Sequence, residues 1–381
     1  MSKSTSNSDF IADANLPLSM TVEDHWLCET FVVDRDRTGY QYSILGNRYT
    51  PMHNPDIPPS SSTARHSEAR AVSLVFLHAG GMVKESFEPV IKLLFKEHRE
   101  NEMRSGVRVV VKEAWSIECP NHGSSAAFNT FTIRKRPALS WSFLDYAEAA
   151  HVFLTNKPGG HDLSTRNLVL IGQSLGAHII PFIAQMSPKL SIHSIVLAEP
   201  SLSLPCHERN MAMKVFSETS LCKHNIWESR DAVRRHFETY RISKHWSRDA
   251  RETFLENGIV EDPVLCSFGF KGVRLACSRE QEASMYVSVA EDDEGYDLLA
   301  GLYASDIPVH YLYDPNPPSL LAFFLPAWFS CKGLRPDTVN PVQGGHMFFQ
   351  SNPQHTAKAI GKTLRHERSS SAVAAKTVAR M

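Results

Sequence analysis

The sequence lacks the cysteine pattern of a metal-binding or disulfide-stapled protein. Its seven cysteines are odd in number, and none falls in a CxxC pair. This scatter argues against a zinc site and against a disulfide framework, and a reducing compartment is the simpler environment for such a chain. No metal or organic cofactor is implied. The cysteines are Cys28, Cys119, Cys206, Cys222, Cys266, Cys277 and Cys331.

An excess of charge and a long apolar run are also missing. The 40 Lys and Arg residues nearly balance the 41 Asp and Glu residues, so nothing points to nucleic acid or to an anionic membrane. The apolar runs have the length of strands, well short of a bilayer span, and we expect no transmembrane segment. Residues 1–20 are polar and lack the apolar region of a secretory signal. We therefore expect a soluble intracellular protein.

Strand-like and helix-like segments alternate from residue 71 onward. The strand-like runs are nearly continuous in Val, Ile and Leu, which is typical of strands buried on both faces. Their order predicts an α/β fold with a mainly parallel sheet and helices on both sides. Upstream, residues 29–49 predict two antiparallel strands joined near residues 37–39. The predicted strands are 72–78, 107–115, 167–172, 193–199 and 308–313, and the predicted helices are 88–101, 140–154 and 175–187.

One long segment interrupts this alternation. Residues 201–305 are charged, rich in aromatic residues and helical in period, and they lie between the fourth and fifth strands, where a plain crossover needs far less chain. We predict a helical cap over the carboxyl edge of the sheet, with a return strand near 272–277. The predicted organisation is a core of residues 20–200 and 306–365, the cap of residues 201–305, and a flexible tail of residues 366–381.

The stretch GQSLG, residues 172–176, fits the G-x-S-x-G pattern of a nucleophile elbow. A strand precedes it and a helix follows it, which is the context that this motif requires. At so tight a turn, side chains at Gly172 and Gly176 would collide with neighbouring chain, and the helix start favours developing negative charge. We therefore predict Ser174 as a nucleophile; the alternative is an ordinary helix N-cap.

A serine nucleophile requires hydrogen-bond donors for the oxyanion that forms when it attacks a carbonyl. The residue after it, Leu175, offers one backbone N–H. The second donor is expected from the loop after the first parallel strand, where the chain reads HAGGM. We assign the N–H of Met82, with Gly81 as the neighbouring candidate. We expect His78 to pin this loop rather than to act as a base.

The general base is expected beyond the last strand, following the chain order serine, acid, histidine. His346 in GGHMF fits, because two glycines let its loop bend over the nucleophile. Two carboxylates end strands and could each orient His346: Glu199 closes the fourth strand and Asp314 closes the fifth. We favour Glu199, since an Asp-Pro turn accounts for Asp314, and Asp314 stays the alternative acid.

Together these motifs resemble a known family. HAGGMVKESFEP, SIECPNHGSSAAFN, GQSLGAH, LAEP and GGHMF resemble motifs of the α/β-hydrolases. As a set they are similar to the fungal peroxisomal lipase-like branch, especially the hydrolases encoded in Alternaria host-selective toxin clusters, which make epoxy-decatrienoic acid toxins. The resemblance spans about residues 20–365.

The resemblance implies an α/β-hydrolase fold and carries over site roles by position. Ser174 would be the nucleophile, His346 the base, and Met82 with Leu175 the oxyanion hole. The chain also departs from the family pattern. Glu118 stands where the family has aspartate, Gly80 replaces asparagine, and Asp314 replaces a glycine, which strengthens Glu199 as the acid.

The predicted function is hydrolysis of a carboxylic ester or thioester by a Ser-His-acid triad. A cofactor-free C–C bond hydrolase is an alternative, since it also uses serine and histidine, and a non-catalytic binding protein that retains the fold is another. Aromatic residues of the cap would supply an apolar pocket for an acyl chain or would only pack the cap onto the core. These residues are Trp227, Phe237, Tyr240, Trp246 and Phe254.

The chain ends in Ala379-Arg380-Met381, which resembles the tripeptides of peroxisomal import. This ending predicts a peroxisomal import receptor as a partner and a peroxisomal location, with the cytoplasm as the alternative. In a peroxisome, the expected substrate is an acyl-CoA or a medium-chain fatty ester. By family analogy, the expected process is fungal toxin biosynthesis.

Overall fold

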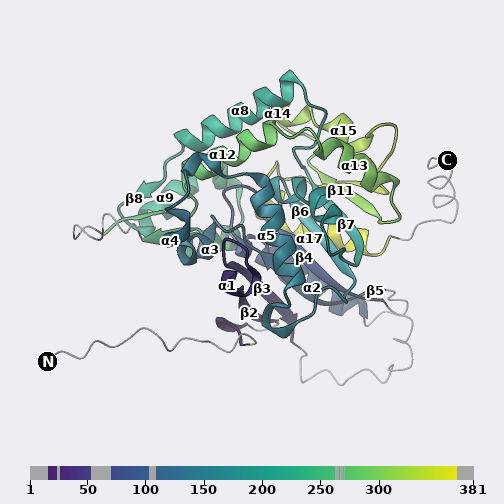
Figure 1. Ribbon diagram of the computed structural model, residues 1–381, viewed down its shortest axis with the longest axis horizontal. Coiled ribbons are helices and arrows are strands. Elements are labelled where there is room, and N and C mark those ends of the chain that lie inside the picture. Colours follow the sequence, from purple (N-terminus) through teal and green to yellow (C-terminus); the bar gives the residue numbers. More distant parts are fainter. Residues whose placement is uncertain are drawn as a thin grey trace.

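The computed structural model describes residues 16–23, 26–52, 70–102, 109–261, 266, 269 and 271–366. Its central feature is a nine-stranded sheet (Figure 1). The strands are β1 (Ser19–Glu23), β2 (Trp26–Val33), β3 (Ile44–Pro51), β4 (Arg70–Leu77), β5 (Val109–Ile117), β6 (Leu168–Gln173), β7 (Ile192–Ala198), β11 (Val309–Tyr313) and β12 (Thr338–Pro341). They follow the order β1-β2-β3-β5-β4-β6-β7-β11-β12 across the sheet.

The predicted mainly parallel sheet is confirmed. β5, β4, β6, β7, β11 and β12 pair in parallel with their neighbours in this part of the sheet. β1, β2 and β3 add an antiparallel edge, and the two antiparallel strands expected within residues 29–49 belong to β2 and β3. Every residue of β6 is buried, as the continuous apolar run predicts for a strand covered on both faces.

Helices cover both faces of the sheet, and each covered face has its own core. Alternate side chains of β4 point to opposite sides: Phe76 packs in the core beneath α2 (Glu88–Glu102) and α17 (Pro353–Leu364), whereas Val75 packs in the core beneath α5 (Phe143–Thr155). α2 and α17 contact each other along the first face. These two cores fix the carboxyl ends of the strands, where the candidate site residues lie.

Two predicted helices have different boundaries in the structure. The helix expected at residues 140–154 begins at Phe143, because Ser142 caps it by accepting a hydrogen bond from the Leu144 amide. The single helix expected at residues 175–187 is two short helices, α6 (Leu175–His178) and α7 (Ile180–Gln185). Pro181 lies in the first turn of α7, where its missing N–H is tolerated but cannot continue α6.

The cap segment, residues 201–305, contains five of the longer helices and a small second sheet. α8 and α12 pack side by side along the top of the view in Figure 1. The strand expected near residues 272–277 is β10, which pairs with β8 and β9 and not with the main sheet. These elements are α8 (His207–Cys222), β8 (Ile226–Trp227), α9 (Arg230–Thr239), α10 (Arg248–Asn257), β9 (Ile259–Glu261), β10 (Val273–Leu275), α12 (Arg279–Ala290) and α13 (Gly295–Ala304).

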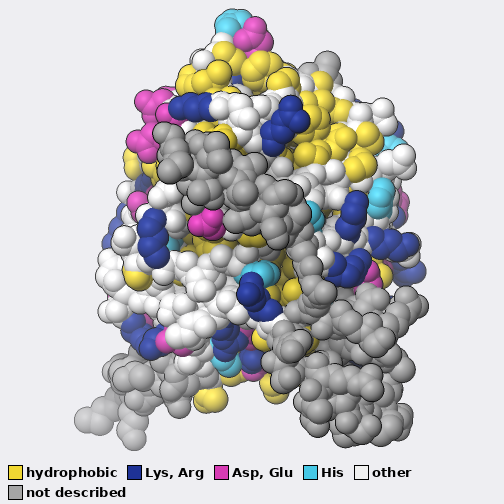
Figure 2. Space-filling model, turned by 90° about the vertical axis from the view of Figure 1, so that its right-hand side faces the viewer, with side chains coloured by type: hydrophobic (Ala, Val, Ile, Leu, Met, Phe, Trp, Pro, Cys, Tyr) yellow, Lys and Arg dark blue, Asp and Glu magenta, His cyan; other side chains and the backbone are white. Residues whose placement is uncertain are grey.

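Short helices complete the described chain, and none of its helices has both the length and the apolar character needed to cross a bilayer. On the face shown in Figure 2, hydrophobic side chains gather toward the top, which is the end where α8 lies in Figure 1. The short helices are α1 (Arg35–Thr38), α3 (Gly123–Phe128), α4 (Thr130–Ile133), α14 (Ser319–Ala322), α15 (Leu325–Phe329) and α16 (Phe348–Ser351).

Candidate active site

Ser174 occupies a sharp turn between β6 and α6. Its backbone has φ 53° and ψ −115°, a conformation that non-glycine residues rarely adopt and that marks a strained turn. The serine amide donates to the Ala198 carbonyl at 2.8 Å. A Cβ on Gly172 would collide with the Gly176 carbonyl, and one on Gly176 would collide with the Leu77 carbonyl. The steric role predicted for both glycines is therefore confirmed.

His346 lies beside Glu199. The imidazole Nδ1 is 2.6 Å from Glu199 Oε2, and the glutamate side chain is only 1% exposed. Glu199 itself has a positive φ of 47°, so its carboxylate leaves the end of β7 from a constrained backbone. With Nδ1–H donated to Glu199, the other ring nitrogen, Nε2, is the hydrogen-bond acceptor that a general base requires.

Hydrogen bonds to backbone carbonyls hold together the segments that carry Ser174, His346 and Glu199. Ser174 bonds to Ala198, the residue before Glu199. Gln173, the residue before the serine, donates its side-chain N–H to the His346 carbonyl at 3.3 Å. Among the described residues no hydrogen bond joins Ser174 Oγ directly to His346; in enzymes without bound substrate such bonds are often long.

Asp314 has a different task from Glu199. Its Oδ2 accepts hydrogen bonds from the amides of Gly344, at 2.9 Å, and of Gly345. Its own amide donates to Glu199 Oε1 at 2.7 Å. The two carboxylates that the sequence offers as alternatives are thus both used: Glu199 contacts the imidazole ring, whereas Asp314 holds the backbone of the loop that carries it.

Gln173 is a site residue that the sequence reasoning missed. Its side chain forms reciprocal hydrogen bonds with Gln350, of 3.1 and 3.2 Å, besides its bond to the His346 carbonyl. It therefore fixes the histidine loop from the strand that carries the nucleophile. The x of G-x-S-x-G is unconstrained in the motif, and the only available signal was a polar side chain at the end of an apolar strand.

The amides expected to form the oxyanion hole lie in the glycine loop, residues 78–83, and at the start of α6. Leu175 is the first residue of α6, where amides have no partner within the helix. The Gly81 amide donates to His122 Nε2 at 3.0 Å and is therefore committed. The Met82 amide donates to the Ala79 carbonyl at 3.1 Å, so an oxyanion would share this donor in a three-centre bond.

His78 pins the glycine loop, as the sequence predicts. Its Nδ1 bonds to the Ala79 carbonyl at 2.9 Å, and its Nε2 accepts from the Cys119 amide at 3.0 Å. Burial lowers the pKa of His78 to about 4, which keeps the ring neutral as this bonding requires. Burial also holds the pKa of His122 well below its usual value. Neutral His122 Nε2 can therefore accept the Gly81 N–H.

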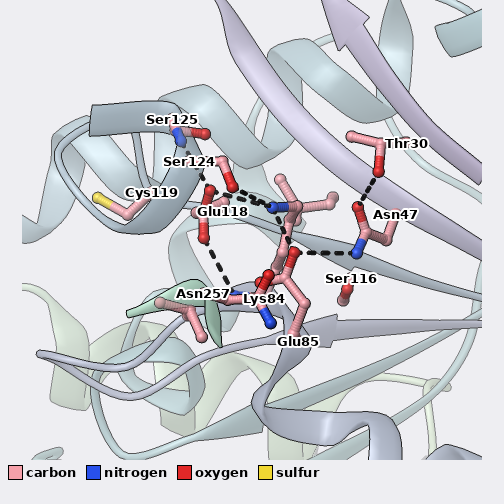
Figure 3. Close-up of polar contacts among 12 residues, drawn as sticks. Thr30, Asn47, Lys84, Glu85, Ser116, Glu118, Cys119, Ser124, Ser125 and Asn257 are labelled. Atoms are coloured by element: carbon pink, nitrogen blue, oxygen red, sulfur yellow. Dashed lines mark hydrogen bonds and ion pairs between the residues drawn. The ribbon is translucent and has the colours of Figure 1, made fainter. Parts of the chain in front are cut away.

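A buried ion-pair network begins immediately after the glycine loop (Figure 3). Lys84 Nζ is 2.6 Å from Glu85 Oε1 and 3.3 Å from Glu118 Oε2, and the lysine side chain is 1% exposed. Glu118 also accepts from the amides of Lys84, at 3.3 Å, and Ser125, at 2.8 Å. The network therefore ties the glycine loop to the chain that follows β5.

Glu118 has a raised pKa within this network. Burial and the neighbouring Glu85 charge raise the pKa of Glu118 to about 7, while the Lys84 ammonium acts in the opposite direction. One oxygen of Glu85, Oε2, is buried with no hydrogen-bond partner. A single lysine, Lys84, thus faces the two carboxylates of Glu85 and Glu118. Position 118 is the one where the resemblance implies an aspartate.

The aromatic residues of the cap pack onto the glycine loop. Trp227, Phe237, Trp246 and Phe254 form one buried cluster with Ala79, Met82 and Val83, and the exposed fraction of each of the four aromatic residues lies between 4% and 8%. Tyr240 stacks on His236 at the margin, with 5.1 Å between the ring centroids. These contacts agree with the packing alternative predicted for these side chains.

Within the described ranges, no three His, Cys, Asp or Glu side chains gather as they would around a metal ion. The predicted import tripeptide, Ala379-Arg380-Met381, lies outside the described residues.

Comparisons with known proteins agree with this architecture. A model of the alpha/beta hydrolase family matches residues 74–359. The structure is similar to the peroxisomal alpha-beta-hydrolase Lpx1 from Saccharomyces cerevisiae, with a TM-score of 0.65 and 17% identity over 92% of each chain. No curated protein sequence matches the chain.

Two further solved structures share the fold. A thioesterase domain from the curacin biosynthetic pathway has a TM-score of 0.55 and 14% identity, covering 87% of this chain and 99% of that one. An esterase of M. tuberculosis has a TM-score of 0.52 and 14% identity, covering 87% and 96%. At such low identity these likenesses show the fold alone, and the expected α/β-hydrolase fold is confirmed.

Proposed function

Since the chain belongs to the alpha/beta hydrolase family, we propose that it is a serine hydrolase that cleaves a carboxylic ester or a thioester. The observation that carries the proposal is the 2.6 Å contact of Glu199 with His346 Nδ1 next to the strained turn at Ser174. A nucleophile, a base and a group that orients the base are the three parts that covalent acyl transfer requires.

In the proposed mechanism, His346 Nε2 takes the proton of Ser174 as its Oγ attacks the substrate carbonyl. Glu199 stabilises the imidazolium that forms, and the carbonyl oxygen gains negative charge. The amides of Leu175 and Met82 donate to this oxyanion. His346 then gives its proton to the departing alcohol or thiol, and water releases the acyl group by the reverse sequence of proton transfers.

The proposed substrate is a medium-chain acyl ester or acyl-CoA. One similar structure is described as a thioesterase domain and another as an esterase, which supports both bond types as candidates. The resemblance to hydrolases of Alternaria toxin clusters supports a role in fungal host-selective toxin biosynthesis. If this role holds, deleting the gene in the source organism abolishes toxin production, and normal toxin levels would contradict it.

The proposed location is the peroxisome. Its support is the ending Ala379-Arg380-Met381 together with the similarity to a peroxisomal hydrolase of yeast. An amino-terminally tagged chain should co-localise with a peroxisomal marker, and the same chain without residues 379–381 should stay in the cytoplasm. Unchanged localisation of the shortened chain would contradict the use of this tripeptide.

The decisive experiment is active-site labelling with a fluorophosphonate. The wild-type protein and a Ser305→Ala control, altered at the end of α13, should be labelled, whereas Ser174→Ala should not. Loss of the nucleophile should lower kcat by about 10⁴-fold or more. A folded wild-type protein that stays unlabelled, beside a reactive reference hydrolase, would instead favour the non-catalytic alternative.

A panel of matched substrates separates the possible reactions. An ester, a thioester and a β-diketone with the same acyl chain are compared, with Ser174→Ala as the background. Turnover of the ester or thioester supports the proposal, and turnover of the diketone alone would identify a C–C bond hydrolase.

A further inference from the structure

Helix α12 of the cap approaches the two glycines of the glycine loop. A Cβ built on Gly81 would lie 2.8 Å from Glu282 Oε2, and one built on Gly80 would lie 2.7 Å from the Tyr286 hydroxyl. Glu282 and Tyr286 are one helical turn apart and therefore face the loop together. The glycines are required here because cap side chains occupy the space that their own side chains would fill.

The Glu282 carboxylate forms a buried ion pair. Lys223, the residue that ends α8, bonds through Nζ to Glu282 Oε2, and Ser220 donates its hydroxyl to Glu282 Oε1 at 2.9 Å. The side chains of Lys223 and Glu282 are only 18% and 8% exposed. Water therefore screens these charges poorly, and each acts strongly on its neighbours.

Other titratable groups surround the pair. Burial raises the pKa of Tyr286 and of Cys277, and the Glu282 charge raises both further. Lys223 adds to the burial that lowers the pKa of His122, whose Nε2 accepts the Gly81 N–H. More distant charges, Arg274 and Glu280, act on Cys277 in opposite directions. The charge of Lys223 therefore acts on His122, the side chain that binds an amide of the glycine loop.

A carboxylate in this position creates an electrostatic conflict. The glycine loop supplies the amide of Met82, which would donate to an oxyanion, while Glu282 lies against the preceding residue, Gly81. A negative charge there opposes the negative charge that develops on the substrate oxygen. Lys223 is the positive partner that offsets this charge while Glu282 keeps its contact with the loop.

We propose that Lys223 is a positioning residue of the oxyanion site: it cancels the charge of Glu282, so that this glutamate can brace the glycine loop without opposing the oxyanion. This inference rests on the proposed serine hydrolase function. The cap would then help to stabilise the transition state through the charge balance at Glu282, without contacting the substrate.

The test is a double-mutant cycle of Lys223→Met and Glu282→Gln with an ester substrate. Lys223→Met should lower kcat by about 10- to 100-fold and leave KM unchanged, because the unpaired carboxylate acts only once charge develops. Adding Glu282→Gln should restore kcat to within a few fold of wild type, since it removes that charge. Lys223→Arg should also retain activity. Lys214→Met, on the same helix but paired with exposed Glu218, is the matched control and should have no effect.

Two readouts separate this role from a merely structural one. Rescue of Lys223→Met by Glu282→Gln is the first readout, because restored kcat requires that the charge of Glu282, and not lost packing, causes the defect. A boronic acid, whose adduct with serine is an anion, should bind Lys223→Met more weakly by the same factor as the loss in kcat. Thermal unfolding reports whether each variant is folded.

The outcomes distinguish the two levels of the hypothesis. If the wild type reacts with fluorophosphonate but folded Lys223→Met keeps full kcat, or if the double variant is no more active than Lys223→Met, this inference is overturned and the hydrolase function stands. If the wild type neither reacts nor turns over substrate, both are overturned.

Discussion

The glycine loop is held by two ion-pair clusters, one on its core side and one on its cap side. On the core side, Lys84 is almost fully buried between Glu85 and Glu118, two carboxylates of the core. On the cap side, Lys223 is partly exposed and pairs with Glu282 alone. The core cluster carries one carboxylate more than it can neutralise, whereas the cap pair is balanced.

This difference separates stability from rate. Lys84 lies within the sheet core, so breaking its cluster leaves buried charges without partners and should destabilise the fold. The Lys223 side chain is 18% exposed, compared with 1% for Lys84, so its loss should cost less stability, and the Glu282 charge that remains acts on the nearby oxyanion. Variants of the Lys84 cluster should therefore change unfolding, and variants of the Lys223–Glu282 pair should change turnover.

The largest effect is expected at Glu199. Glu199→Gln should lower kcat by about 10³- to 10⁴-fold, because the amide cannot stabilise the imidazolium and permits the wrong ring tautomer. Asp314→Asn should cost only about 10-fold, since it weakens the hold on the loop amides of Gly344 and Gly345 but keeps the contact of Glu199 with the ring. The measurement is kcat/KM for an ester, with unfolding curves as the folding control.

The reverse ranking would contradict this assignment. If Asp314→Asn abolished activity while Glu199→Gln stayed close to wild type, Asp314 would be the acid, and the contact between Glu199 and His346 would be structural.

The residues of the proposed triad could be selected from the sequence because each lies in a turn or loop that follows a strand of the parallel sheet. Parallel strands bring their carboxyl ends to one edge, so the motif at Ser174 and the chain order were enough to select His346. The sequence favoured Glu199 over Asp314 only through the Asp-Pro turn at Asp314, since both residues follow neighbouring strands. The choice between them depends on a positive φ at Glu199 and on loop amides that face Asp314, which no sequence pattern records.

The partners of the glycine loop were not predictable. The glycines at 80 and 81 indicated a close approach of backbone, but Glu282 and Tyr286 lie about 200 residues later in the chain. The cap segment is charged throughout, so nothing in its pattern singles out the pair of Lys223 with Glu282. Local signals predict local geometry, and contacts between distant segments depend on the packing of the whole fold.

Breaking the core cluster should give the largest loss of stability. Lys84→Met should lower the free energy of unfolding by about 3–5 kcal/mol, because it leaves two buried carboxylates unpaired. Lys223→Met should change it much less. Urea unfolding measures both variants, and Lys214→Met serves as the exposed control. A destabilisation by Lys223→Met as large as that by Lys84→Met would remove the proposed distinction between the two sides.

The excess carboxylate of the core cluster should appear in the pH dependence of stability. Glu118 has a pKa raised to about 7, above its value of 4.5 in the unfolded chain, so the folded protein binds more protons between these values. Its contribution to stability is therefore present below pH 4.5 and is lost as pH rises toward 7. Relative to wild type, Glu118→Gln should gain stability over this window and then level off. A difference that does not vary with pH would show that folding does not raise the pKa of Glu118.

The smallest of these effects is expected in the aromatic packing of the cap. Phe254 lies 5.3 Å from Phe237 and 5.7 Å from Trp246, measured between ring centroids, in the cluster that covers Met82. Phe254→Leu removes part of this contact and should cost about 1–2 kcal/mol of unfolding free energy. Because the Lys223–Glu282 pair stays intact, kcat should fall by less than about threefold, measured with the same ester as for Lys223→Met. A loss of kcat as large as that of Lys223→Met would show that apolar packing, and not charge, couples the cap to the glycine loop.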